Sequence, residues 1–180
     1  ARAVWTDHKN AEARKILDEI ITLKKGTINQ LATVQFIFGS LHLENKELAK
    51  ALKCFEKASA LKPTDIALLE NIQWTIVWNH YLLKNDSNVI SSTEKFIKKT
   101  NNQNFVAKLN YWKGKSHLRM GKTDGAKAIF DELMTSDPFG YYGILASIEL
   151  EKPLLPLTSV QNPIISSGNQ VLDWLIFEFL

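Results

Sequence analysis

The sequence has few of the residues on which several classes of small protein depend. Its single cysteine, Cys54, can form neither an internal disulfide nor a cysteine-rich zinc site. No apolar run approaches the roughly 20 residues that cross a bilayer, so we expect no transmembrane helix. Residues 1–10 lack the basic and then apolar layout of a secretory signal, and an exported form is expected to have lost its signal already.

Arginine is scarce, although the chain is basic. Its 180 residues carry a formal net charge of +3, yet only Arg2, Arg14 and Arg119 are arginines. The positive charge lies in residues 1–130, whereas residues 131–180 are acidic. Lysines spaced three or four apart usually mark a solvated helix face, and a nucleic-acid surface needs arginines and exposed aromatics as well. The composition therefore argues against nucleic-acid binding.

Apolar residues recur at helical spacing along most of the chain. Gly26 and Pro63 stop two of these patterns, and Asp65 is a good N-cap for the next. No stretch shows the alternation of a β-strand. The pattern predicts helices over residues 11–23, 27–43, 46–61, 65–84, 87–99, 104–120, 123–135 and 139–151. The expected fold class is all-α.

One helical hairpin occurs twice. Aligning Gly39 with Gly114 also pairs Ala51 with Ala126, Phe55 with Phe130, Pro63 with Pro138, His42 with His117 and Leu43 with Leu118, while Ala58 meets Leu133 as the one departure. This pattern resembles the tetratricopeptide repeat, in which small residues let two helices approach and an aromatic ring fills the gap. The copies are about two repeat lengths apart, so we expect a degenerate middle hairpin. Residues 1–152 should form a right-handed superhelix of stacked antiparallel hairpins.

The fourth predicted helix is apolar on nearly every side. Only Asn71, Thr75 and Asn79 form a polar stripe along it. A helix of this kind is normally buried between neighbours, which a stack of hairpins provides. Trp74 and Trp78 lie one turn apart and could stack on a sugar, but the all-round apolarity favours a place in the core.

Residues 153–180 differ from the part before them. Pro153, Pro156 and Pro163 form a connector, and the apolar stretch 171–180 then has neither a cap nor a polar end. The outermost layer of a repeat stack should be polar on its outer side. We therefore expect that the chain is a fragment, or that this stretch docks onto something else.

A denser motif precedes that connector. It comprises Tyr111, Trp112, Gly114, Ala126, Phe130, Pro138, Tyr141, Tyr142 and Gly143. Over residues 104–152 this pattern resembles the end of the α-superhelical domain of soluble lytic transglycosylases, where a Tyr-Trp helix is followed by a short helix, a proline and a Tyr-Tyr-Gly helix. Lys115 stands where arginine is common in that family. The same residues also suit close packing of one helix on the previous one.

The resemblance implies a periplasmic enzyme of the cell wall. Such enzymes cleave the β-1,4 bond between N-acetylmuramic acid and N-acetylglucosamine in peptidoglycan, leaving a 1,6-anhydro end, with one glutamate as acid and then base. The resemblance places that glutamate, followed by serine, in a separate lysozyme-like domain, and no glutamate here precedes a serine. It thus implies a scaffold for that catalytic domain, with no catalytic residue or cofactor of its own.

Two further patterns have simpler explanations. Gly121-Lys122-Thr123 resembles the end of a phosphate-binding loop, but the glycine required five residues earlier is replaced by Ser116, and the tripeptide joins two helices. The histidines are His8, His42, His80 and His117. None has metal-ligand spacing, so no metal site is predicted, and the matching repeat positions of two of them favour packing.

Glu70 and Cys54 are the remaining candidates. Glu70 within an apolar helix could be a buried acid with a raised pKa, but a rim carboxylate paired with a neighbouring polar group is favoured. Cys54, beside Phe55, is expected to be a small core residue.

Two functions remain open from the sequence. The first is the scaffold part of a lytic transglycosylase, which helps to hold peptidoglycan. The second is a helical-repeat adaptor that binds a peptide or protein in its concave groove. An independent enzyme is the weakest alternative.

Overall fold

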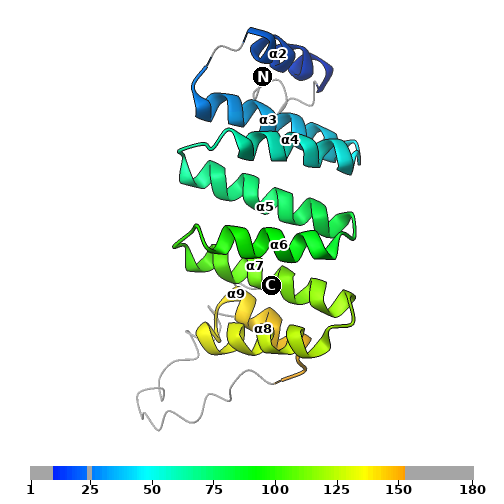
Figure 1. Cartoon of the computed structure of the whole chain (residues 1–180), viewed down its shortest axis with the longest axis vertical. Coiled ribbons are helices and arrows are strands. Elements are labelled where there is room, and N and C mark those ends of the chain that lie inside the picture. The colour runs from blue at the N-terminus through cyan, green and yellow to red at the C-terminus, as the bar shows by residue number, and fades with distance from the viewer. Residues whose placement is uncertain (1–9, 24–25, 153–180) are drawn as a thin grey trace, which may run out of the picture.

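The computed structural model describes residues 10–23 and 26–152, and all regular structure in these ranges is helical. Its helices are α2 (Asn10–Leu23), α3 (Ile28–Glu44), α4 (Leu48–Ala60), α5 (Ile66–Leu82), α6 (Asp86–Ile97), α7 (Gln103–Arg119), α8 (Thr123–Ser136) and α9 (Tyr141–Glu149). Figure 1 shows them following one another along the long axis, from α2 at the top to α8 and α9 at the bottom. The predicted all-α superhelical stack is confirmed. The connector and the apolar stretch 171–180 lie outside the described residues.

Three antiparallel hairpins form the body of the stack, and they are α3–α4, α5–α6 and α7–α8. The second helix of each hairpin packs on the first helix of the next, and α9 packs on α8 in the same way. Helix α2 packs on α3 at the other end. Within the described residues, no helix is long and apolar enough to cross a bilayer.

The same turn closes each hairpin. Lys46, Lys84 and Gly121 adopt left-handed backbone angles, with φ of 59°, 59° and 73°. Each donates its N–H to the carbonyl three residues earlier, and the following N–H reaches the carbonyl five residues back. This arrangement satisfies helix-end carbonyls. The turn recurs at Glu151, so α9 occupies the place of the first helix of a further layer.

Close approach within the first and third hairpins depends on a glycine facing a phenylalanine. A Cβ atom at Gly39 would overlap the ring of Phe55, and one at Gly114 would lie 2.5 Å from Cε1 of Phe130. Both rings are fully or almost fully buried. The predicted small-residue and aromatic pairing is therefore present in both sequence copies.

The middle hairpin solves the same packing problem with different side chains. Counted from the shared turn, Val77 stands where the other hairpins have glycine, and Thr93 stands where they have phenylalanine. Both residues are fully buried. In this hairpin the larger side chain is on the first helix and the smaller one is on the second, which explains why the repeat pattern looked degenerate in the sequence.

The polar stripe along α5 is only partly exposed. Asn71 is exposed, but Asn79 is fully buried. Asn79 Nδ2 donates to the carbonyl of Thr75 at 2.9 Å, while its Oδ1 has no hydrogen-bond partner in the part of the chain that the structure describes. Counted from the turn, Leu41 occupies the equivalent place in the first hairpin and is also fully buried. This repeat position is therefore buried in both hairpins, whether it holds leucine or asparagine.

The stack has an inner side. Helices α3, α5, α7 and α9 contact one another in succession, whereas no comparable contacts join α4 to α6 or α6 to α8 in the described part. The first helices of successive hairpins thus approach one another more closely than the second helices do, as in curved repeat arrays. We call the side formed by α3, α5, α7 and α9 the inner face.

Candidate functional site: the inner face of α5, α7 and α9

A row of aromatic side chains crosses the inner face between α5 and α7. Trp74, Trp78 and Tyr81 follow one another along α5, with 5.8 Å between successive ring centroids. Trp112 of α7 meets Trp78 and Tyr81 edge-on, at 4.8 and 4.7 Å. Edge-to-face contacts at these separations are favourable for aromatic rings.

All four rings of this aromatic row are only half-buried. The expectation that Trp74 and Trp78 belong to the core is therefore only partly right, because Trp74 packs against the core from its edge. The core side of α5 carries Ile72, Ile76 and Val77 instead. A helix that is apolar all round has one side in the interior and another on the inner face.

Cations from α7 lie over the row. Lys108 Nζ is 3.9 Å from the Trp74 ring centroid, and the Arg119 guanidinium carbon is 4.0 Å from that of Tyr81. An ammonium or guanidinium group over an aromatic face is attracted by the ring quadrupole. Burial lowers the pKa of Lys108. No ion pair joins Lys108 to a carboxylate within the described residues, so its charge is available to a ligand.

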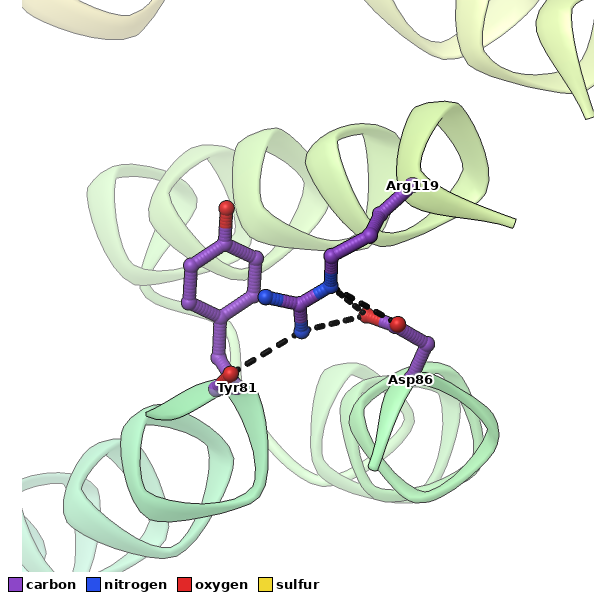
Figure 2. A network of polar contacts seen from close by, with 3 residues as sticks. All are labelled: Tyr81, Asp86 and Arg119. Carbon is purple, nitrogen blue, oxygen red and sulfur yellow. Dashed lines mark hydrogen bonds and ion pairs between the residues drawn. The ribbon is translucent and has the colours of Figure 1, made fainter. Parts of the chain in front are cut away.

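Arg119 also joins α7 to the end of α5 and the start of α6 (Figure 2). Its Nε and Nη2 atoms donate to the carboxylate of Asp86, at 2.6–2.9 Å, and Nη2 also donates to the carbonyl oxygen of Tyr81 at 2.9 Å. Asp86 raises the pKa of Arg119 through these bonds. One guanidinium thus joins α5, α6 and α7 at this end of the row.

A hollow of about 340 Å³ opens at the other end of the row. Trp74 and Lys108 line it with Tyr142 of α9, and exposed amides stand at its edge. Glu70 lies there too, and its oxygens accept from Thr100 Oγ1 at 2.8 Å and Asn102 Nδ2 at 2.9 Å. Glu70 is therefore a rim carboxylate paired with polar neighbours, as the sequence favoured.

The residues of the dense sequence motif converge where α7, α8 and α9 pack together. Tyr111, Ala126 and Phe130 are buried in one cluster with Ala146, and Trp112 and Tyr142 pack against it. The Tyr111 ring lies 5.7 Å from that of Tyr142, and its hydroxyl donates to Glu149 at 2.9 Å. Burial and Glu149 together raise the pKa of Tyr111.

The remaining motif residues shape the entry to α9. A Cβ at Gly143 would overlap the carbonyl oxygen of Asp137, the residue before Pro138, so only glycine permits this close approach. Tyr141 is 68% exposed and stacks edge-on against Tyr142, 5.0 Å away. Lys115, which replaces a common arginine, forms an ion pair with Glu149 at 2.7 Å.

The histidines prove to be a repeated feature. Counted from the turn, His42, His80 and His117 occupy equivalent places in all three hairpins, a relation that the sequence alignment missed for His80. His42 Nδ1 lies 2.5 Å from Glu47 Oε2, whereas His80 Nδ1 and both ring nitrogens of His117 have no hydrogen-bond partner among the described residues. Burial lowers the pKa of His80 and of His117.

Other predicted sites can be placed as well. Gly121-Lys122-Thr123 forms the turn between α7 and α8, and Cys54 is half-buried on α4. Within the described ranges, no cluster of potential ligands could hold a metal ion. His8 lies outside these ranges.

Comparison with protein-family models identifies two segments. The model of the tetratricopeptide repeat matches residues 32–65 and 107–139, which include most of the first and third hairpins. These two segments are therefore similar to tetratricopeptide repeats. Searches of the curated proteins and of the solved structures found no significant match. Tetratricopeptide repeats form helical scaffolds and commonly mediate protein–protein interaction, and none of these comparisons bears on the lytic-transglycosylase resemblance.

Proposed function

We propose that this chain is a non-catalytic helical scaffold whose inner face binds an extended polypeptide segment. The observation that carries the proposal is the half-exposed row of Trp74, Trp78, Tyr81 and Trp112, which ends at the hollow beside Lys108. Aromatic side chains anchor many protein interfaces, because they bury a large area at a small loss of side-chain entropy.

The ligand chemistry follows from the groups along the row. The rings offer apolar contact, Asn71 and Asn104 offer exposed amides, and Lys108 offers a cation without a carboxylate partner. An extended backbone carries both donors and acceptors for the amides, and an acidic group would neutralise the ammonium. Lys108 already covers Trp74, so a flat sugar ring could not stack there without displacing it.

Selection of binding peptides from a random library tests this proposal. Peptides recovered with the unaltered chain should bind Trp112→Ala and Lys108→Gln at least about tenfold more weakly, the effect of one interface hot spot. The control is Lys127→Gln, a change at an exposed lysine on α8 that should leave affinity unchanged. Equal binding by the inner-face variants and the control would rule out the inner face as the site.

We further propose that the scaffold serves a periplasmic lytic transglycosylase, whose catalytic domain is a separate part of the polypeptide. The support for this proposal is that the motif of Tyr111, Trp112, Gly114, Tyr141 and Tyr142 belongs to one packed unit, α7 to α9. Such a unit would connect the stack to a catalytic domain on its C-terminal side. On this proposal the partner is peptidoglycan, reached through the parent enzyme.

The parent gene tests the second proposal independently of the first. We expect a lysozyme-like segment with a Glu-Ser pair downstream of Leu180, and specific retention of the parent protein on murein sacculi. The described residues alone should release no anhydro-muropeptides. A reading frame that stops without such a segment, or turnover by this chain alone, would refute the proposal while leaving peptide binding open.

A further inference from the structure

A second hollow lies on the opposite side of α5 from the aromatic row. Its volume is about 460 Å³, and α4, α5 and α6 line it. The floor is a single helical face of α5, formed by Leu69, Gln73, Ile76 and His80, at successive spacings typical of one helix side. The walls come from the second helices of the first two hairpins. We call this space the outer hollow.

Two polar side chains are buried in the floor of the outer hollow. Gln73 is 5% exposed and His80 is 7% exposed. His80 Nδ1 has no hydrogen-bond partner within the described residues, although a buried polar group normally has one. His80 lines the hollow, but this nitrogen is itself out of contact with solvent, so a molecule in the hollow would act on the imidazole through its charge.

The charges around the outer hollow are unbalanced. Lys62, Lys95 and Lys99 line it, against a single carboxylate, that of Glu56. In the described part of the chain, none of the three lysines forms an ion pair. The hydroxyl-bearing residues Ser59 and Ser92 also contribute to the walls, so hydrogen-bond donors accompany the positive charge.

We infer that the outer hollow binds a small oxyanion, a phosphate- or carboxylate-bearing molecule, between Lys62, Lys95 and Lys99 and over His80. An oxyanion accepts hydrogen bonds from ammonium and hydroxyl groups and balances the excess charge. A neutral or cationic molecule would leave the lysines uncompensated. The volume is within the range of small-molecule sites. This site is separate from the inner face and does not depend on peptide binding there.

Binding should be coupled to the protonation of His80. Burial lowers the pKa of His80, and Glu56 on α4 acts in the opposite direction. The other charged groups at the hollow are Lys62 just after α4, Lys95 of α6 and Lys99 just after α6, while α5 contributes no other charged side chain there. A bound anion favours the imidazolium, so it raises this pKa. For an anion whose own charge stays constant, affinity should therefore increase as pH falls below about 6.5, toward the lowered pKa of free His80.

Calorimetric titration with inorganic phosphate and with citrate tests the inference and separates the two sources of the anion. The test variant is Lys95→Gln/Lys99→Gln, and the control is Lys53→Gln/Lys127→Gln, which removes the same charge from exposed positions outside the hollow. We expect saturable binding with one of the two anions. The test variant should bind about fivefold more weakly, which is the effect of losing two solvent-exposed ion pairs. The control should keep the affinity of the unaltered chain.

Ring NMR of the histidines provides a second readout that does not depend on folding of the variants. Saturation with the bound anion should raise the pKa of His80 and leave that of His117 unchanged. Equal loss of affinity in both double variants, an equal pKa shift of His80 and His117, or no saturable binding in the millimolar range would each overturn the inference. Any of these results would show adventitious attraction to lysines only.

Discussion

The glycine at the centre of each repeat hairpin leads to a quantitative prediction. At Gly39, an added methyl group would overlap the Phe55 ring, which is fully buried. Overpacking of this kind destabilises by about 1–3 kcal/mol. Alanine has a higher helix propensity than glycine, which offsets about 0.5–1 kcal/mol of this destabilisation. We therefore expect Gly39→Ala to lower the free energy of unfolding by about 1 kcal/mol.

A double-mutant cycle separates the two opposing effects. Phe55→Val alone should cost about 2 kcal/mol, because it leaves a cavity. In that background the methyl group no longer meets a ring, so Gly39→Ala should stabilise by about 0.5–1 kcal/mol. The two changes are thus expected to couple by about 2 kcal/mol. The middle hairpin, with Val77 and Thr93 at the same places, is a natural version of the double variant.

Urea unfolding followed by circular dichroism measures all four members of the cycle. The slope of free energy against urea should stay constant, which shows that the unfolded state is unchanged. Additive effects of the two substitutions, or a stabilising Gly39→Ala in the unaltered background, would refute the size-complementarity argument.

Three further predictions concern polar groups. Arg119→Lys should destabilise by about 1–2 kcal/mol, because lysine cannot keep both the paired bonds to Asp86 and the carbonyl bond; thermal unfolding that matches the unaltered chain would contradict this. Asn79→Leu should stabilise by about 1 kcal/mol, since it removes a buried oxygen without a partner and restores the residue type found at Leu41; a lower urea midpoint would show that the oxygen is satisfied. Acidification should lower the free energy of unfolding, because the folded-state pKa of His80 lies below 6.5 and the unfolded state takes up the proton first. This free energy is expected to fall as pH drops below about 6.5, and to fall less in the His80→Phe variant.

Much of the fold could be predicted from residue spacing alone. The Gly39–Phe55 and Gly114–Phe130 pairs indicated two hairpins, because a gap between helices and the ring that fills it must occur at fixed separation along one hairpin. The N-cap at Asp65 was also correctly predicted, and its side chain accepts from the N–H of Leu68 at 3.0 Å. These features are local, so periodicity is enough to find them.

The candidate site was harder to predict, since it depends on contacts between layers. The half-exposure of Trp78 and the equivalence of His80 with the other two histidines were missed. Aligning the turn residues Lys46, Lys84 and Gly121 would have revealed the histidines, but two of the three are lysines, which give no turn signal in a sequence.

The sequence by itself determined the helices, the hairpins and the tight glycine–phenylalanine contacts, because each is fixed by side-chain size and spacing within one short segment. The tertiary structure decided which side of α5 faces the interior, that Arg119 meets Asp86, and that two hollows open on opposite sides of the stack. Those relations join residues from different hairpins. They depend on how the hairpins stack on one another. A helix that is apolar on every side has no amphipathic pattern to show which of its sides faces a neighbour.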